Sequence, residues 1–223
     1  MTRYFSPELF KFLKSLKRNN RREWFQKNKE RYEEELKQPM LRFITDLKAE
    51  LQSVHAYIKV DPKPVGGSLF RIYRDMRFSE DKSPYKTHLA AHFHHRSSAK
   101  DVHTPGYYLH LEPGACFAAA GIWRPDAPTL LQIRQRIVQE PAAWRKIIRK
   151  IPELGGDSLK KAPKGFDAEH PHALDLKRKD FISSVPFTEK AVCSGTFMKQ
   201  YLASCQKIDP LLVFLTDALG LPW

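Results

Sequence analysis

Residues Leu69–His88, LFRIYRDMRFSEDKSPYKTH, interleave cations with aromatic rings in a pattern that predicts two strands joined by a tight connection. Side-chain alternation places Phe70, Ile72 and Arg74 on one side of the first strand. Leu69, Arg71 and Tyr73 fall on the other side. Arg and Lys bind phosphate and carboxylate oxygens, and five lie in this stretch: Arg71, Arg74, Arg77, Lys82 and Lys86. The stretch therefore predicts an anion-binding site.

The same stretch also carries acids that can neutralise its cations. Asp75, Glu80 and Asp81 lie between the basic residues, so a structural network of ion pairs is the alternative interpretation. Arg71 faces away from Arg74 on an extended strand, and the two cannot share a site unless one lies at the strand end. The other four cations converge only if the connecting loop folds back.

Further strands are predicted on both sides of this stretch. Lys86–His95 alternates, with Leu89, Ala91 and Phe93 on one face and His88, Ala90, His92 and His94 on the other. A hairpin with a turn at Pro113-Gly114 is predicted for Gly106–Glu112 and Cys116–Trp123. Tyr57–Val60 and Phe181–Phe187 are shorter candidates. Consecutive short strands joined by turns favour an antiparallel or mixed sheet of about five strands.

Helices are predicted before the strands. Ser6-Pro7-Glu8 is typical of a helix start, with a hydroxyl cap and a proline in the first turn. Asn20 and Glu23 have the spacing of a capping box, which predicts a second helix through about Lys37. Pro39 is expected to begin a third helix.

Helices are also predicted after the strands, around Leu130–Val138 and from Pro141 onward. Thr196–Gln206 and Pro210–Leu219 are expected to be two closing helices, the second capped by Asp209 and ended by Gly220. Helices segregated at both ends of a run of strands predict one α+β domain over residues 1–223.

The predicted hairpin carries a candidate for proton transfer. Tyr108, His110 and Glu112 share one strand face, and a histidine oriented by a carboxylate can move a proton. A hydrogen-bonded sheet face is the alternative. Tyr85 is a second candidate proton-transfer group, and Asn28, on an otherwise apolar helix face, is a candidate ligand contact.

Histidines recur at His88, His92 and His94, with His95 and His103 nearby. Alternate positions on a strand can present imidazoles to a metal. Because no Cys, Asp or Glu lies at ligand spacing beside them, the sequence predicts a surface row rather than a metal site. It names no cofactor.

Charge and cysteine usage indicate the compartment and the partners. Lys and Arg number 38 against 25 acids, so the formal net charge is +13, which attracts nucleic acid, phosphorylated metabolites or acidic surfaces. Cys116, Cys193 and Cys205 form no framework spacing, which favours a reducing compartment. With neither a signal layout nor a long apolar run, we expect a cytoplasmic protein that does not enter a membrane.

Several longer stretches resemble one family. They are LKRNNRREWFQKNKERYE, LFRIYRDMRFSEDKSPYKTHLAAHF, PGYYLHLEPGACFAAAGIWRP and APKGFDAEHP. Together they are similar to the family catalogued as domain of unknown function 2461, over about Phe5 to Leu219. The resemblance implies a single α+β domain and no established activity. Members often carry glycines after the histidine-containing hairpin, and here Ala118–Ala120 precede Gly121.

Together these patterns predict a protein that recognises an anionic ligand, and they favour a phosphorylated one. The ligand would contact Arg71, Arg74, Arg77, Lys82, Lys86, Tyr108, Glu112 and Asn28. One alternative is an enzyme acting on a phosphorylated or carboxylated substrate, with His110 or Tyr85 in proton transfer. The other is a nucleic-acid-associated protein that uses its basic surface, although no nucleic-acid-binding motif is visible. The oligomeric state is not indicated.

Overall fold

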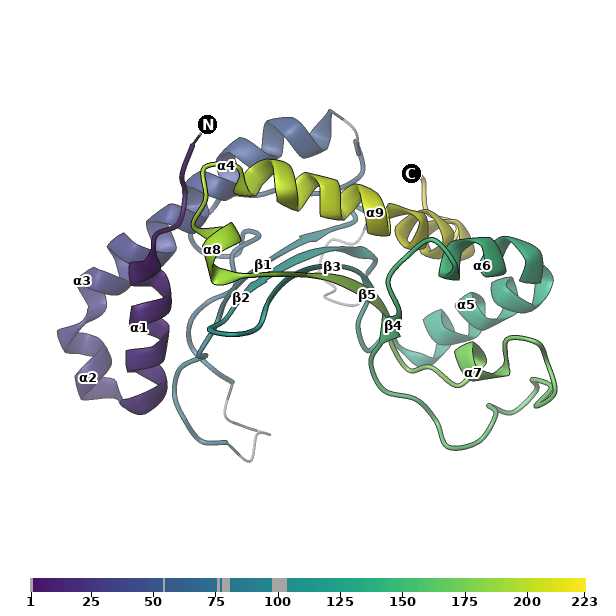
Figure 1. Cartoon of the computed structure of the whole chain (residues 1–223). Helices are drawn as coiled ribbons and strands as arrows, with labels where there is room; N and C mark the ends of the chain where they lie inside the picture. The colour runs from purple at the N-terminus through teal and green to yellow at the C-terminus, as the bar shows by residue number, and fades with distance from the viewer. Residues whose placement is uncertain (1, 54, 76, 78–80, 98–103) are drawn as a thin grey trace.

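The computed structural model describes residues 2–53, 55–75, 77, 81–97 and 104–223, with an antiparallel sheet at its centre (Figure 1). Its strands are β1 (Leu89–His94), β2 (Gly106–Leu111), β3 (Cys116–Ile122), β4 (Leu154–Gly155) and β5 (Phe181–Phe187). Their order is β1-β2-β3-β5-β4, and all four pairings are antiparallel. The prediction of an α+β fold around an antiparallel five-stranded sheet is confirmed.

The β2–β3 hairpin has the predicted turn. The amide of Ala115 donates to the Glu112 carbonyl at 3.0 Å, and Gly114 adopts a φ of +79°. A glycine reaches this left-handed region without the steric cost that a Cβ would bring. The hairpin register pairs Tyr108 with Ala119 and His110 with Phe117.

The predicted strand at Leu69–Arg74 is wrong. This segment forms no strand, and its pairing with neighbouring segments consists of isolated bridges, Leu69 to Ala91 and Tyr73 to Tyr85, and single backbone hydrogen bonds. Leu69 and Ile72 are both buried in the core, whereas the predicted alternation placed them on opposite sides. A bend in the segment turns both side chains inward, so it runs beside β1 as an irregular edge.

The N-terminal helices start as predicted and then diverge from the prediction. In α1 (Pro7–Arg18) the Ser6 side chain accepts from the Glu8 amide. The next helix, α2 (Arg22–Lys27), has no side-chain cap, so the predicted capping box is wrong. Asn20 instead binds the backbone of Tyr85, donating to its carbonyl at 2.9 Å and accepting from its amide at 3.1 Å.

Pro39 lies in the first turn of α4 (Gln38–Gln52), as predicted, although helical backbone leads into it without a break. Helical backbone continues through α3 (Lys29–Tyr32), a π-helical turn (Glu33–Lys37) and α4 (Gln38–Gln52). A proline inside a helix clashes with the carbonyl four residues earlier, here that of Glu35. The wider π turn immediately before it loosens this spacing, so the helix continues past Pro39.

The C-terminal half contributes α5 (Ala127–Gln139), α6 (Pro141–Ile148), α7 (Ala173–Leu176), α8 (Glu189–Val192) and α9 (Phe197–Ala218). The two predicted closing helices are one helix, with Pro210 inside it. Asp209 does not cap it, because its carboxylate accepts from the Tyr107 hydroxyl at 2.5 Å. Gly220, at a φ of +64°, follows the helix end as predicted.

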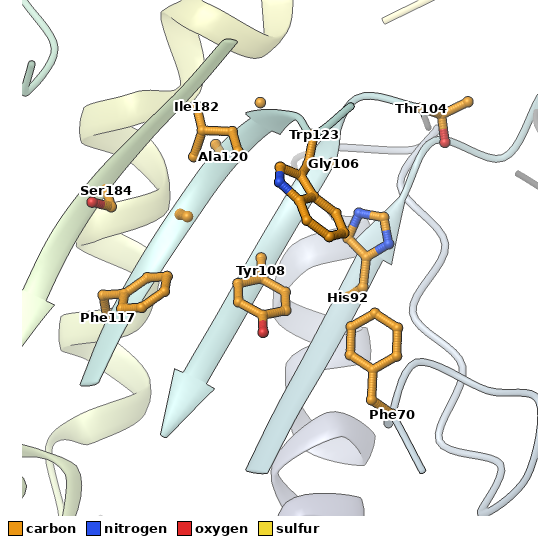
Figure 2. A pocket seen from close by; sticks show the side chains of 12 residues that line it. Phe70, His92, Thr104, Gly106, Tyr108, Phe117, Ala120, Trp123, Ile182 and Ser184 are labelled. Atoms are coloured by element: carbon orange, nitrogen blue, oxygen red, sulfur yellow. The ribbon is translucent and has the colours of Figure 1, made fainter. Parts of the chain in front are cut away.

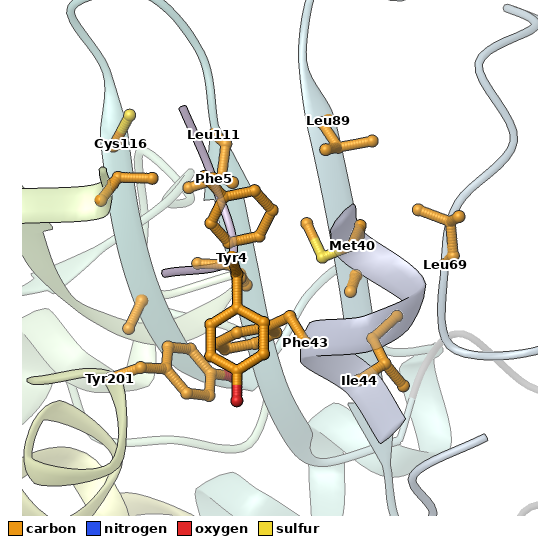
Figure 3. Close-up of a cluster of buried hydrophobic side chains, with 14 of the residues drawn as sticks. Tyr4, Phe5, Met40, Phe43, Ile44, Leu69, Leu89, Leu111, Cys116 and Tyr201 are labelled. Atoms are coloured by element: carbon orange, nitrogen blue, oxygen red, sulfur yellow. The ribbon is translucent and has the colours of Figure 1, made fainter. Parts of the chain in front are cut away.

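Helix α9 lies across one face of the sheet beside α4 (Figure 1). The main core fills the space between them, with Met40, Phe43 and Ile44 of α4 and Tyr201 of α9 packed over Leu89 and Leu111 (Figure 3). A second cluster lies where α5 and α6 meet the other end of α9, around Trp144, Phe181 and Leu215. The opposite face of the sheet carries the candidate site.

No helix within the described ranges is both long enough and apolar enough to span a membrane.

Candidate functional site

The face of the sheet opposite α9 carries three cross-strand rows of side chains. Because side chains alternate, the residues between the core positions point away from α9. The pairings define the rows as Ala90–His110–Phe117–Pro186, His92–Tyr108–Ala119–Ser184 and His94–Gly106–Gly121–Ile182. We call this surface the open face. It brings together the histidine strand and the Tyr108–Glu112 strand, which were separate candidates in the sequence.

A hollow of about 470 Å³ lies on the open face (Figure 2). The hollow is deep at its centre because Gly106 and Gly121 have no side chain there and Ala119 has only a methyl group. Gly121 is required there, since its φ is +139° and a Cβ would lie 1.9 Å from the Phe181 carbonyl oxygen. The walls are mostly rings: Phe70, His92, Tyr108, Phe117 and Trp123.

The walls come from segments far apart in the chain. Phe70 belongs to the irregular edge segment and lies parallel to the His92 ring, with their centroids 6.3 Å apart. Trp123 follows β3 directly and is 55% exposed. The hollow is therefore open to solvent on a largely aromatic surface, which suits a flat or apolar ligand body.

Beside the hollow, a chain of hydrogen bonds links Tyr108, His110 and Glu112. The Tyr108 hydroxyl is 3.0 Å from His110 Nδ1, and His110 Nε2 is 3.2 Å from Glu112 Oε2. Thr87 donates to the other carboxylate oxygen of Glu112 at 3.3 Å. Since a carboxylate only accepts, His110 Nε2 carries the proton here and Nδ1 accepts from Tyr108. The predicted row is present and is hydrogen-bonded along its length.

His88 lies beside this chain, a position that strand alternation alone does not predict. Its ring lies 4.5 Å from that of His110, and one ligand atom from each of His88, His110 and Glu112 lies within 4.8 Å of the others. Burial lowers the pKa of His88 to about 4, and the charge on His110 adds to the effect. Burial also lowers the pKa of His110, although Glu112 opposes this. Both imidazoles are therefore neutral at physiological pH.

Three of the predicted cations lie near this group. The Lys86 ammonium is 5.1 Å from the centre of the Phe70 ring and donates to the Arg71 carbonyl at 3.1 Å. Burial lowers the pKa of Lys86, and the charges of Arg71 and Arg74 lower it further. Arg74 pairs with Asp81 at 2.8 Å, while its buried Nε has no hydrogen-bond partner among the described residues. Lys86 thus lies beside Phe70, one of the rings that line the hollow, and the charges of Arg71 and Arg74 act on it.

The other predicted cations lie on the loop beyond Arg74. Arg77 is exposed and binds Asp75 at 2.7 Å, an ion pair that holds the pKa of Asp75 well below its usual range. Lys82 is exposed. Glu80, part of the predicted ion-pair network, lies outside the described residues, but the Arg74–Asp81 and Arg77–Asp75 pairs show that acids do neutralise some of these cations.

Two further candidates lie away from the open face. Tyr85 is buried in the main core with its ring stacked on Phe25, the centroids 4.1 Å apart. Asn28 donates to the Trp24 carbonyl at 2.9 Å and accepts from Arg31 at 3.3 Å. Both side chains are occupied by packing or by helix contacts, so we leave them out of the site proposed below.

The histidines of β1 make other contacts than His88, which precedes that strand. His92 stacks on Phe70, and His94 Nδ1 lies 3.0 Å from the His95 carbonyl. His103 lies outside the described residues. The basic stretch before β5 is in part structural, because Arg178 binds Asp175 and the Leu154 carbonyl.

Comparison with protein families gives one match, over residues 8–214, to the model of DUF2461, described as a conserved hypothetical protein. The match confirms the resemblance found in the sequence. No curated protein and no solved structure matches the chain.

Proposed function

The chain belongs to the DUF2461 family, whose description names no activity, and we propose from the open face that the protein binds a small anionic ligand with an aromatic or apolar body. The body would lie in the ring-lined hollow. The anionic group, a phosphate or a carboxylate, would reach the Lys86 ammonium beside Phe70. The observation that carries the proposal is Phe70, which lines the hollow and has the Lys86 ammonium 5.1 Å from the centre of its ring.

The hollow supports the binding of an aromatic or apolar ligand body. Its volume of about 470 Å³ falls in the range of small-molecule sites, roughly 300–1,000 Å³. Polar groups are few on its lining, and Thr104, Ser184 and His92 supply them. Such a surface binds by burying apolar area, and the few polar groups orient the ligand.

The cations around Lys86 support the binding of an anionic group. A lysine ammonium has three N–H donors, and Lys86 uses one on the Arg71 carbonyl, which leaves two for a ligand. Burial and the neighbouring guanidinium groups of Arg71 and Arg74 disfavour the charged ammonium. An anion bound to Lys86 would offset this effect, and Arg74 Nε is a buried donor with no hydrogen-bond partner among the described residues.

Calorimetric titration with matched aryl probes tests the proposal. We expect phenyl phosphate and nucleoside monophosphates to bind more tightly than phenol and nucleosides. Lys86→Gln should weaken the anionic probes by about 1.5–3 kcal/mol, the usual value of a charged hydrogen bond, and leave the neutral ones unchanged. Phe70→Ala should weaken the binding of anionic and neutral probes alike, because both kinds of probe have the same apolar body.

Lys48→Gln is the matched control, since it removes one positive charge from an exposed position on α4, which packs against the opposite face. It should bind every probe as the parent does. If Lys86→Gln and Arg74→Ala bind the anionic probes like the parent, the Leu69–His88 segment is structural and the proposal fails. The proposal also fails if no probe binds the parent.

The Tyr108–His110–Glu112 hydrogen bonds favour a second candidate, an enzyme that acts on such an anion. In that case His110 would move a proton while the cations stabilise developing charge. His110→Ala should then abolish turnover with little loss of affinity, whereas Arg74→Ala should damage both. A screen of phosphate esters for product formation, with and without divalent metal, separates the two candidates, because a binding protein forms no product.

We also propose a cytoplasmic location, which the three unpaired cysteines support. Nucleic acid as a partner remains a prediction from the net charge alone.

A further inference from the structure

We propose that His88, His110 and Glu112 form a binding site for a divalent transition metal ion, with Zn²⁺ as the reference ion. The site lies at the edge of the ring-lined hollow, because the Tyr108 and Phe117 rings that line it both contact His110. This inference goes beyond ligand binding, and it stands or fails independently of the anionic ligand.

The spacing of the three side chains fits a shared ion. Two ligand atoms bound to a tetrahedral Zn²⁺ at 2.0–2.1 Å lie roughly 3.3 Å apart. His110 Nε2 and Glu112 Oε2 are already 3.2 Å apart. His88 completes the group within 4.8 Å, and we expect its ring to turn towards the other two ligands when an ion binds.

Two outer contacts hold the ligands in this orientation. Tyr108 contacts the Nδ1 side of His110, and Thr87 donates to the Oε1 side of Glu112, which leaves Nε2 and Oε2 facing each other. Metal-binding histidines usually have their second nitrogen fixed in this way. With an ion on Nε2, the imidazole proton would move to Nδ1 and be donated to the Tyr108 oxygen. The site therefore predicts a change of tautomer on binding.

The donor set indicates the class of ion. Two imidazoles and one carboxylate suit Zn²⁺, Co²⁺ or Fe²⁺, whereas Mg²⁺ and Ca²⁺ prefer oxygen ligands throughout. Three protein ligands leave at least one coordination position for water or a ligand oxygen. His110 and Glu112 keep 12% and 25% of their side-chain surface exposed, so an ion can enter from solvent.

The neighbouring cations act against an ion, and their effect is limited. The charges of Lys86 and Arg74 reach His88, but they lower its pKa less than burial and His110 do, and Glu112, which raises it, has a larger effect than either. The carboxylate of Glu112 cancels one of the two charges of the ion. The remaining positive charge and Lys86 would then both attract an anion into the hollow.

The experiment uses the full chain with any affinity tag removed, stripped with a chelator and then titrated with Zn²⁺ and Co²⁺. We expect one ion per chain. His88→Gln and Glu112→Gln should each weaken binding by more than about 100-fold, and Tyr108→Phe by about 10- to 100-fold. His94→Gln, which changes a histidine of β1 outside the group, is the matched control and should bind as the parent does. Circular dichroism establishes that each variant is folded.

Nitrogen-15 spectra of the histidine rings provide a test that needs no variant. Zn²⁺ should shift His110 Nε2 and move the proton to Nδ1. The inference is overturned if the parent binds neither ion, if His94→Gln weakens binding as much as Glu112→Gln, or if the His110 tautomer is unchanged on binding. A thiolate-to-cobalt charge-transfer band would likewise overturn it, because the ion would then lie at a cysteine.

Discussion

His92 is largely buried on the open face as a neutral imidazole. Burial lowers its pKa to about 4, with a further contribution from the charge of His94. An unfolded histidine titrates near pH 6.5. Between these two values the unfolded chain binds more protons than the folded chain, so protonation favours unfolding. The stabilising effect of the neutral ring is complete above about pH 6.5 and is lost as the pH falls towards 4.

We therefore expect the free energy of unfolding to decrease between pH 6.5 and pH 5, with His92 contributing at most about 1.4 kcal/mol per pH unit. His92→Gln keeps a polar side chain but cannot titrate, so its stability should depend less on pH in this window. Urea denaturation at several pH values, in the presence of a chelator, gives both profiles. Parallel profiles for parent and variant would contradict the assignment.

Strand alternation predicted from the sequence that Tyr108, His110 and Glu112 share a face, and their hydrogen bonds show that they do. The position of His88 could not be predicted in the same way. It depends on the register in which Ala90 pairs with His110 across β1 and β2. Register is set by turn length and by core packing between segments, and the residues between the two strands give no simple turn from which to count.

At the level of elements, Asn20 connects the N-terminal helices to the segment that carries Lys86. Its side chain makes two hydrogen bonds with the backbone of Tyr85, 65 residues away. From the sequence alone Asn20 is expected to cap a local helix, because a sequence displays only local partners. A cap forms through neighbouring residues, whereas this contact requires the fold to be complete.

We expect Asn20→Ala to lower the free energy of unfolding by about 1–3 kcal/mol, since it leaves the Tyr85 amide and carbonyl without these partners. Asn19→Ala is the matched control. Asn19 makes a side-chain bond only to Ser15 in its own helix, so its loss should cost less. Urea denaturation of both variants provides the comparison, and an equal loss would show that Asn20 is not a tertiary link.

Gly121 sets the depth of the hollow, and its neighbours leave no space for a side chain. We expect Gly121→Ala to destabilise the protein by more than 3 kcal/mol or to prevent folding, because its Cβ would overlap the Phe181 carbonyl at a positive φ. Gly155→Ala, in the adjacent part of the sheet, has open space around its Cβ and should be tolerated. Thermal denaturation measures both, and a stable Gly121→Ala variant would contradict this account of the floor.

Proline positions explain why helix boundaries were harder to predict than helix existence. Pro39 and Pro210 both suggested new helices, yet Pro39, in the first turn of α4, directly follows helical backbone, and Pro210 lies inside α9. A preceding π turn accommodates Pro39. Pro210 is held within α9, whose residues on both sides of it are buried. Tertiary packing outweighs the local cost of the proline, which a single sequence does not display.

At the level of the whole molecule, two hydrophobic clusters share one helix. Tyr201 and Ile208 of α9 belong to the main cluster, and Phe214 and Leu215 belong to the second. The sheet is also continuous from one cluster to the other. A structure joined in this way has no exposed linker at which one half could unfold alone.

We therefore expect a single cooperative unfolding transition, as the prediction of one domain requires. Fluorotryptophan labelling follows Trp24 beside the main cluster and Trp144 within the second. The two resonances should disappear at the same urea concentration. Leu215→Ala, a cavity variant that costs about 2–5 kcal/mol, should move both together. Separate midpoints would show that residues 1–223 form two units.

The position of α9 in the chain also affects how the protein is made. The strands that α9 covers are synthesised before it, so Phe93, Leu109 and Ala118 leave the ribosome without the helix that buries them. At 5–20 residues per second, translation from the end of β1 to the end of α9 takes about 6–25 s. During that time the apolar side chains of these strands lack the cover of α9, and we expect the nascent chain to depend on chaperones. Synthesis of the last turns of α9 thus determines when the chain can bury its core.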